Sequence, residues 1–493
     1  MAHDLGTTGD KATLFDSFGH VIATAFAPYP TNYPEPLHVE QDPESWWNAV
    51  CGTTRRLMDM HPAAQTSLAA VSFSAMMNGC LLLDGNAAIL RPAMIHADTR
   101  SIAQCERIAS EFGMERAYEV TGNRIAPYFT LGKLAWLAEC EPDVVAHARY
   151  CVQAKDFIAG RLTGVWGYTD HSDASLIGCY DLTKLEYCEE LIDAAGFSKS
   201  LLPAPLKSST VVGTVTFEAA RQTGLPAGTR VVIGAGDGAC ATAGAGAVNV
   251  GDAYHYLGGT SWVAALTQGY RPDPTQRVSS FCSVEPEQCV LYGTVQSAGT
   301  SVDWITSILF DLDTSGFKDL EEIASIAKPG SDGLIYLPYL AGERSPIWDA
   351  RAKGVLFGLT AAHGRAEIAR CVLEGVSYAL SSNLKVLTEM GEAGGTLRGL
   401  GGGMRSKLWR SILASVYNRP IALMERLLEA TSCGAAMAAA VGVGICGDYE
   451  AAAKLFTPAG ETVEPDPAAV EVYSVAQERF AALYPALASQ FTG

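Results

Sequence analysis

The chain has 493 residues, more than one hydrophobic core normally organises, so at least two domains are expected. Hydrophobic residues make up 48% of the chain and charged residues 18%, a globular composition that excludes a largely disordered protein. The formal net charge is −18 at pH 7 and no run rich in Lys and Arg occurs, which argues against a nucleic-acid partner.

The N-terminal segment predicts three short strands joined by tight turns. The turn after the first strand reads Gly6-Thr7-Thr8, with Asp4 shortly before it and Lys11 just past it. A glycine lets the backbone approach a phosphate closely, successive N–H groups face the anion, and two hydroxyls donate further hydrogen bonds. A plain hairpin turn explains this segment alone equally well, and a solvated lysine explains Lys11 equally well.

The same pattern returns in the second half of the chain. Strand-like residues 253–257 and 262–266 flank a turn that contains Gly259, Thr260 and Ser261. Two phosphate-type turns at corresponding places in two halves are much harder to dismiss than one. We therefore expect Gly259 and Thr260 to be counterparts of the first turn in a duplicated unit.

Strands alternate with helices in each half, the pattern of sheets with helices packed on them. Buried strands are predicted at residues 71–74 and 231–235, and helices at residues 46–60 and 365–390.

One segment, residues 203–228, is rich in Pro, Gly and Thr and carries only short strand-like runs. We place the change of domain just after it. The predicted division is an N-terminal domain at 1–232, a C-terminal domain at 233–465, and a closing amphipathic helix within 466–493.

An aspartate stands among small residues where the strand at 231–235 ends. Asp237 is flanked by Gly236 and Gly238, so nothing bulky hides it. Such a residue is either a helix N-cap or a catalytic base on the floor of a cleft, and caps are the commoner of the two. Asp4 and Asp237 together offer the two carboxylates that phosphoryl transfer divides between Mg²⁺ and a hydroxyl proton.

A glycine turn follows a predicted strand near residue 400. Gly402 and Gly403 precede Met404, and a helix begins near Lys407. Flat glycine backbone suits contact with an adenine ring, although a plain tight turn is equally compatible with this segment.

Two other nucleotide-binding motifs are disfavoured. Gly442, Gly444 and Gly447 match the spacing of a dinucleotide fingerprint, but they follow a helical Ala-rich run where the motif requires a strand. A dehydrogenase is therefore disfavoured. No G-x-x-x-x-G-K-[S/T] sequence occurs, which argues against a P-loop kinase.

Thirteen cysteines are scattered along the chain without any C-x-x-C pair. This arrangement predicts reduced thiols in a cytoplasmic enzyme. The sequence shows no signal peptide and no apolar run of membrane-spanning length, so no membrane partner is expected.

Taken in order, these motifs resemble the FGGY family of carbohydrate kinases over nearly the whole chain, and most of all its xylulokinase branch. The matching segments are residues 4–8, 40–43, 46–47, 77–79, 90–93 leading to Asp98 and Arg100, 237, 259–260, 338–346 and 401–403. Residues 354–374 resemble the second family signature, with Cys371 where Ala or Ser is usual. Each motif is short, but their joint order is specific.

The resemblance implies an α/β fold of two ribonuclease H-like domains, of the actin and hexokinase type, that flank a cleft for ATP and Mg²⁺. It implies that Asp237 is the base that deprotonates a primary sugar hydroxyl, and that Asp4 and Asp237 hold the metal. The implied ATP-binding residues are Thr7, Thr8, Lys11, Gly259, Thr260, Gly402, Gly403, Met404 and Lys407. The implied sugar-binding residues are Met77, Asn78, Asp98 and Asp237.

The implied reaction is phosphorylation of D-xylulose to D-xylulose 5-phosphate, but three positions depart from the branch. Asn78 stands where histidine is usual, Gly238 where asparagine is usual and His96 where tryptophan is typical. Asn78 can still hydrogen-bond a hydroxyl, whereas Gly238 cannot do so through a side chain. Gluconate, ribulose, erythritol and glycerol therefore stay open as alternative substrates.

A sugar- or nucleotide-binding regulator without turnover is the alternative of another class, since fold alone does not give function. Retention of Asp4 and Asp237 favours the enzyme. A homodimer is expected only from the base rate for soluble enzymes.

Only three residues precede Asp4, fewer than family members typically carry before this aspartate. We expect either a late start or a lost beginning. We also expect a first strand that is destabilised or partly unpaired.

Overall fold

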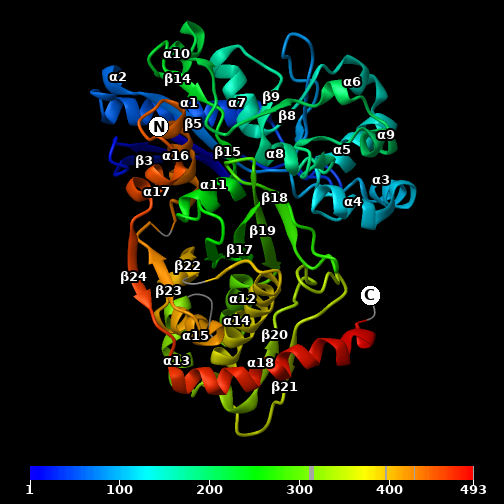
Figure 1. The fold of residues 1–493 in the computed structure, drawn as a ribbon, viewed down its shortest axis with the longest axis vertical. Coiled ribbons are helices and arrows are strands. Elements are labelled where there is room, and N and C mark those ends of the chain that lie inside the picture. The colour runs from blue at the N-terminus through cyan, green and yellow to red at the C-terminus, as the bar shows by residue number, and fades with distance from the viewer. Residues whose placement is uncertain (310–315, 395–396, 427, 492–493) are drawn as a thin grey trace.

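The computed structural model describes residues 1–309, 316–394, 397–426 and 428–491. Two seven-stranded sheets organise the chain, and helices pack against both of them (Figure 1). This arrangement confirms the predicted α/β class with two sheet-containing halves.

The two sheets repeat one pattern of strands. The first has the order β13 (Val211–Thr214), β14 (Arg230–Val232), β5 (Ala70–Ala75), β1 (Ala2–Leu5), β2 (Gly9–Phe15) and β3 (Val21–Pro28), and β15 (Ala235–Gly236) also pairs with β5. The second has the order β18 (Ser279–Cys282), β19 (Gln288–Val295), β17 (Ser261–Gln268), β16 (Ala253–Tyr256), β22 (Leu397–Leu400), β23 (Ile421–Met424) and β24 (Ala459–Val463). In each sheet an antiparallel meander lies beside a parallel strand, so the predicted duplication is confirmed in the topology.

The first strand is paired along both of its edges. β1 pairs antiparallel with β2 and parallel with β5 over its whole length. The Ser72 N–H donates to the carbonyl of Met1 at 3.1 Å, and the terminal amino group donates to the carbonyl of Ala70 at 2.9 Å. The expectation of a partly unpaired first strand is therefore wrong, because β5 and β2 supply ladder partners for every residue of β1.

Helices cover both sheets at the places where sequence periodicity predicts the longest ones. The helices beside the first sheet and its insertions include α1 (Pro43–Met60), α2 (Ala64–Ser67), α3 (Ile102–Ile108), α4 (Met114–Thr121), α5 (Thr130–Cys140), α6 (Pro142–His147), α7 (Ala154–Thr163), α8 (His171–Ser175), α9 (Glu189–Ala195) and α10 (Phe217–Thr223). Those of the second half include α12 (Gly299–Leu309), α13 (Phe317–Ala324), α14 (Arg365–Glu389), α15 (Lys407–Tyr417) and α18 (Pro467–Leu487). None of the helices that the structure describes is long and apolar enough to cross a membrane.

The start of α1 shows how local chemistry moves an element boundary. The helix begins at Pro43, three residues earlier than periodicity predicts. The carboxylate of Asp42 accepts a hydrogen bond from the Glu44 N–H at 3.0 Å, and proline is well suited to the first helical position because its missing N–H needs no partner there.

Two helices from distant parts of the chain pack unusually closely beside the first sheet. α11 (Asp237–Gly244) contacts α16 (Ala430–Gly442), which also packs against β5 and β1 (Figure 1). A Cβ on Gly244 would lie 1.8 Å from the Ala430 carbonyl oxygen, and one on Gly434 would lie 2.1 Å from the Cys240 carbonyl oxygen. Only glycine at these two positions allows the backbones to approach this closely.

We predict that Gly434→Ala destabilises the protein, because the added methyl group meets backbone that cannot move aside. The expected loss is about 2–3 kcal/mol in the free energy of unfolding, measured by chemical denaturation. Gly52→Ala is the matched control, since Gly52 lies within α1 and a Cβ there would meet no atom within 4 Å. The control should be neutral or stabilising by up to ~1 kcal/mol. Equal effects of the two substitutions would contradict the close packing.

Candidate active site

Asp4 and Asp237 lie at the same edge of the first sheet. β5 runs parallel to β1 on one side and to β15 on the other, and Ser74 is paired with both Asp4 and Ala235. Neighbouring strands lie about 4.8 Å apart, so Asp4 is two strand spacings from the segment that leads into Asp237. The sheet therefore brings together the two carboxylates that the sequence singled out.

Asp237 is the first residue of α11. Gly236 occupies the N-cap position and offers no side chain for capping. Burial raises the pKa of Asp237 to about 7, the charge of Asp4 adds to the rise, and the Gly238 N–H opposes it. A carboxyl group with such a pKa is suited to accept a proton at neutral pH.

Asp4 is held by a residue from the far end of the chain. The Thr431 hydroxyl donates to Asp4 Oδ2 at 2.6 Å, and Lys11 Nζ lies 3.8 Å from the same oxygen. Burial raises the pKa of Asp4, while Lys11 and the Thr431 hydrogen bond oppose the rise. Lys11 also donates to the carbonyl of Leu428 at 3.0 Å, and only 28% of its side chain is exposed. It is therefore part of the site and not simply a solvated lysine.

Hydrogen bonds to its carbonyl groups fix the Gly6-Thr7-Thr8 turn in place. The Tyr29 hydroxyl donates to the Gly6 carbonyl, and the Tyr29 N–H donates to the Thr8 carbonyl at 3.2 Å. Gln41 Nε2 donates to the Thr7 carbonyl at 2.8 Å. Thr7 and Thr8 themselves are exposed, so their hydroxyls face solvent, where an anion can reach them.

The second turn is built differently. The Thr260 hydroxyl donates to the carbonyl of Gln296 at 3.0 Å, and the carbonyl of Gly259 accepts from the Ala298 N–H at 2.9 Å. Because the proton of the Thr260 hydroxyl has a partner inside the protein, the two turns are equivalent in topology but not in the hydroxyls that they offer.

In the glycine turn after β22, the space beside Gly402 is free and the space beside Gly403 is filled. Gly402 is exposed, and a Cβ there would meet no atom within 4 Å, whereas a Cβ on Gly403 would lie 2.5 Å from the Leu257 side chain. Met404 is fully buried, so its side chain is not available to a ligand in this structure. Lys407 is exposed at the first position of α15.

Met77 and Asn78 lie next to the residue that precedes Asp237. A Cβ on Gly236 would lie 2.4 Å from the end of the Met77 side chain. Asn78 has a left-handed backbone with φ +64°, its carbonyl accepts from Lys133 Nζ at 3.0 Å, and its buried Oδ1 has no hydrogen-bond partner among the described residues. An unsatisfied buried acceptor at this place suits a ligand hydroxyl.

Asp98 is committed to partners within the protein. Its carboxylate accepts from the Val39 N–H at 2.7 Å and from Arg100 Nη2 at 2.6 Å, and Arg100 also reaches Glu40 at 2.7 Å. The side chain of Asp98 is fully buried in this network. Because Arg100 also donates to Oδ1, both oxygens of Asp98 have partners within the protein. The motif alone does not reveal this.

Three residues near the two carboxylates were not predicted from the sequence. Thr431 reaches Asp4 from α16, and Phe281 on β18 stands 3.0 Å from the place where a Cβ on Gly238 would lie. The ring of Phe281 meets Tyr292 edge-on at 5.3 Å between centroids. Burial raises the pKa of Tyr292, which also senses the charges of Arg344 and Asp237. None of these three residues carried a sequence signal, whereas Arg344 lies in the matching segment at residues 338–346.

Comparison with known proteins gives consistent matches along the chain. The N-terminal domain model of the FGGY family of carbohydrate kinases matches residues 1–244, and the C-terminal domain model matches residues 256–443. Xylulose kinase of Escherichia coli strain K12 is 33% identical over 85% of this chain and 84% of its own, and gluconokinase of Bacillus subtilis strain 168 is 30% identical over 91% and 88%. The solved structure of xylulose kinase from Rhodospirillum rubrum superposes with a TM-score of 0.92 at 29% identity, covering 99% of both chains.

We predict that Asp237→Asn raises thermal stability in a pH-dependent way. The folded-state pKa of about 7 exceeds the unfolded value near 3.9, so the ionised carboxylate destabilises the fold above pH 7 and has no effect below about pH 4. Allowing for solvent screening, the expected gain at pH 8 in metal-free buffer is about 1–2 kcal/mol, or a few degrees in Tm.

The control for this prediction is a carboxylate whose pKa is shifted the other way. Burial opposes the shift, but hydrogen bonds from His20 and Phe18 together outweigh it and lower the pKa of Asp16. Asp16→Asn should leave Tm at pH 8 unchanged or lower. A gain for Asp237→Asn that persists undiminished at pH 4 would disprove the electrostatic cause.

Proposed function

Since the chain belongs to the FGGY family of carbohydrate kinases, we propose that it transfers the terminal phosphoryl group of ATP to a primary hydroxyl of D-xylulose, giving D-xylulose 5-phosphate. The observation that carries this proposal is the pair of carboxylates, Asp4 and Asp237, at one sheet edge beside the exposed Thr7-Thr8 turn.

In the proposed reaction Asp237 accepts the proton of the attacking hydroxyl. The oxygen forms a bond to the terminal phosphorus of ATP as the bond to the bridging oxygen breaks, and that oxygen leaves with ADP. The pKa of about 7 lets Asp237 hold the proton until it is lost to solvent. Lys11 offsets charge on the transferring group through its ammonium, which already lies beside Asp4.

The donor set at the sheet edge fits Mg²⁺. Mg²⁺ is usually held by one or two carboxylates together with substrate phosphates. Asp4 and Asp237 are carboxylates whose pKa burial raises, and the charge of Asp4 raises the pKa of Asp237 further. Asp4 would hold the ion, with Asp237 beside it. When bound, the ion supplies positive charge that stabilises the phosphates in the transition state.

The remaining nucleotide contacts are proposed from their positions. The hydroxyls and N–H groups of Thr7 and Thr8 would bind phosphate, with Gly259 and Thr260 facing them from the second half. The open side of Gly402 leaves room for the adenine ring, and Gly403, the backbone of Met404 and Lys407 border the same turn. Closure of the two halves would exclude water as a competing acceptor.

On the sugar side, Met77 and Asn78 are the proposed contacts next to the base. The orphan Oδ1 of Asn78 would accept a substrate hydroxyl. Asp98 would act by holding Arg100 and the loop at Val39 in place. Gluconate is the second candidate substrate, because a gluconokinase is 30% identical to the chain over most of its length and because Phe281 occupies the space beside Gly238.

The wider organisation is part of the proposal. The sugar-binding domain would comprise residues 1–232, the nucleotide-binding domain residues 233–465, and the closing helix residues 466–493. All thirteen cysteines are free thiols, which suits a cytoplasmic enzyme. A homodimer is proposed on the base rate of soluble enzymes alone.

A substrate panel tests the reaction directly. ADP release should be stimulated most by D-xylulose, with gluconate, ribulose, erythritol and glycerol compared at equal concentration. A higher kcat/KM for gluconate would make it the substrate. If none of these compounds stimulates ADP release while the protein still binds ATP, the kinase proposal is wrong.

Replacing the base tests the mechanism. Asp237→Ala should lower kcat by 10²- to 10⁴-fold while the Kd for ATP changes little, because a base acts mainly in the transition state. Calorimetric ATP titration and steady-state kinetics measure the two quantities. If the variant instead unfolds while its folded fraction keeps full specific activity, Asp237 is only a structural residue.

A further inference from the structure

The two residues that lead into Asp237 are held from opposite sides. On one side Ala235 and Gly236 pair with β5 at Ser74 and Ala75. On the other side the Gly236 N–H donates to Ser172 Oγ at 3.0 Å. A change in either support would therefore move the start of α11 and the carboxylate that it carries.

Glycine is required where the chain enters this segment. Gly234 has φ +70°, and a Cβ there would lie 1.9 Å from the Phe73 carbonyl oxygen. The Gly234 N–H donates to the carbonyl of Ser208 at 3.0 Å. The chain can thus leave β14, pass close to β5 and reach Asp237 in three residues.

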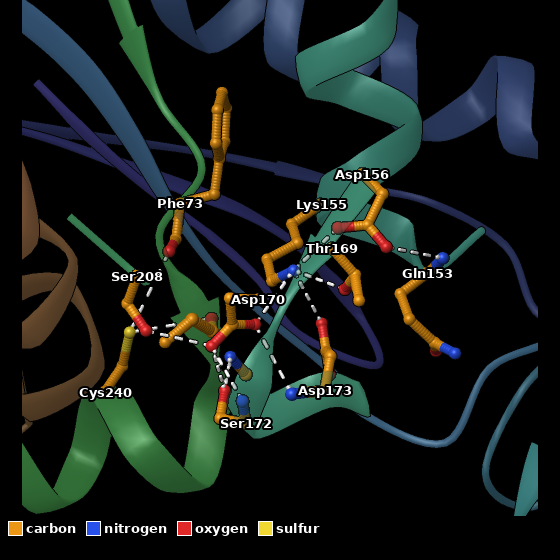
Figure 2. A network of polar contacts seen from close by, with 12 residues as sticks. Phe73, Gln153, Lys155, Asp156, Thr169, Asp170, Ser172, Asp173, Ser208 and Cys240 are labelled. Atoms are coloured by element: carbon orange, nitrogen blue, oxygen red, sulfur yellow. Dashed lines mark hydrogen bonds and ion pairs between the residues drawn. The ribbon is translucent and has the colours of Figure 1, made fainter. Parts of the chain in front are cut away.

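The hydroxyl of Ser172 can only accept the hydrogen bond from the Gly236 N–H, because its own proton is already donated elsewhere. Its hydroxyl proton is donated to Asp170 Oδ2 at 2.6 Å, and its own N–H donates to the same oxygen at 3.0 Å (Figure 2). Since a hydroxyl has one proton and two lone pairs, this bond leaves an acceptor for the Gly236 N–H. Asp170 therefore sets the direction of the hydroxyl that holds Gly236.

Asp170 is in turn fixed by a buried lysine. Lys155 Nζ lies 3.0 Å from Asp170 Oδ1, 2.6 Å from Asp156 and 2.9 Å from Asp173, and all four side chains are buried. Burial opposes the charge of Lys155, but the three carboxylates raise its pKa well above the ordinary range. Burial raises the pKa of Asp173 well above its ordinary range, and the charge of Lys155 opposes this rise.

The oxygens of Asp170 are thereby divided between two tasks. Oδ1 faces the lysine, and Oδ2 faces the hydroxyls of Ser172 and Ser208 (Figure 2). A buried ion cluster is weak support for stability, because desolvation offsets much of the attraction. The cluster does fix the orientation of the groups around it. One of these groups is the Ser172 hydroxyl, which binds Gly236, the residue before Asp237.

We propose that Ser172, oriented by Asp170 and Lys155, is a positioning residue for Asp237. The inference rests on the proposed role of Asp237 as base. Ser172 touches no reacting atom, and its effect passes through the Gly236 N–H to the first turn of α11.

The test compares two buried serines that share one carboxylate oxygen. Ser172→Ala removes the acceptor for the Gly236 N–H. Ser208→Ala removes a hydroxyl that donates to the same Asp170 Oδ2 at 2.9 Å but accepts nothing from Gly236. Ser172→Ala should lower kcat about 10- to 100-fold with KM for sugar and ATP changed less than about twofold, as for other outer-shell partners. Ser208→Ala should lose a similar few degrees in Tm and keep kcat within about twofold.

Equal kcat values for the two variants would overturn the proposal and leave a purely structural network. A rise in KM with unchanged kcat for Ser172→Ala would also overturn it. Should Ser172→Ala fail to fold, Ser172→Cys keeps a donor of similar size with a much weaker acceptor, and it must show the same fall in kcat. Wild-type protein without sugar-stimulated turnover would instead refute the proposed function, so the two failures are distinguishable.

Discussion

The site depends on the burial of two carboxylates that one strand holds together. β5 has parallel neighbours on both sides, and these neighbours carry Asp4 and lead into Asp237. Neither side chain can withdraw, because β1 is paired along both edges and α11 begins at Asp237 itself. Burial raises the pKa of both groups, and the charge of Asp4 raises the pKa of Asp237 further. A cation or a proton at this place would relieve the cost of burying the two charges.

The second constraint is the close packing of two helices that are distant in the sequence. Gly244 and Gly434 let α11 and α16 approach backbone to backbone, and α16 then delivers Thr431 to Asp4. The helix that carries Asp237, the proposed base, and the helix that holds Asp4 are thus one packed unit. If the two halves close around substrates as proposed, such a unit keeps the two carboxylates in register while other parts move.

The proposed sugar side differs from this frame in two smaller features. Phe281 fills the space beside Gly238, and Asn78 presents a buried oxygen without a partner. These features change the shape and hydrogen bonding of the sugar side without touching the carboxylates. The reaction type and the substrate therefore rest on separate parts of the structure, which is consistent with one family containing both xylulose kinases and gluconokinases.

The sequence by itself determined the duplicated α/β architecture and the two Gly-Thr turns, and it singled out Asp4 and Asp237 as candidates, because these depend on local periodicity and short motifs. Only the tertiary structure decided that β1 is fully paired, that Lys11 belongs to the site, that the side chain of Met404 lies in the core, and that Asp98 is bound by Arg100 and Val39. It also revealed Thr431, Phe281 and Ser172, which lie far from the motifs in sequence. The physical reason is that burial, strand register and the direction of a hydroxyl proton depend on residues brought together by folding, and no local pattern records them.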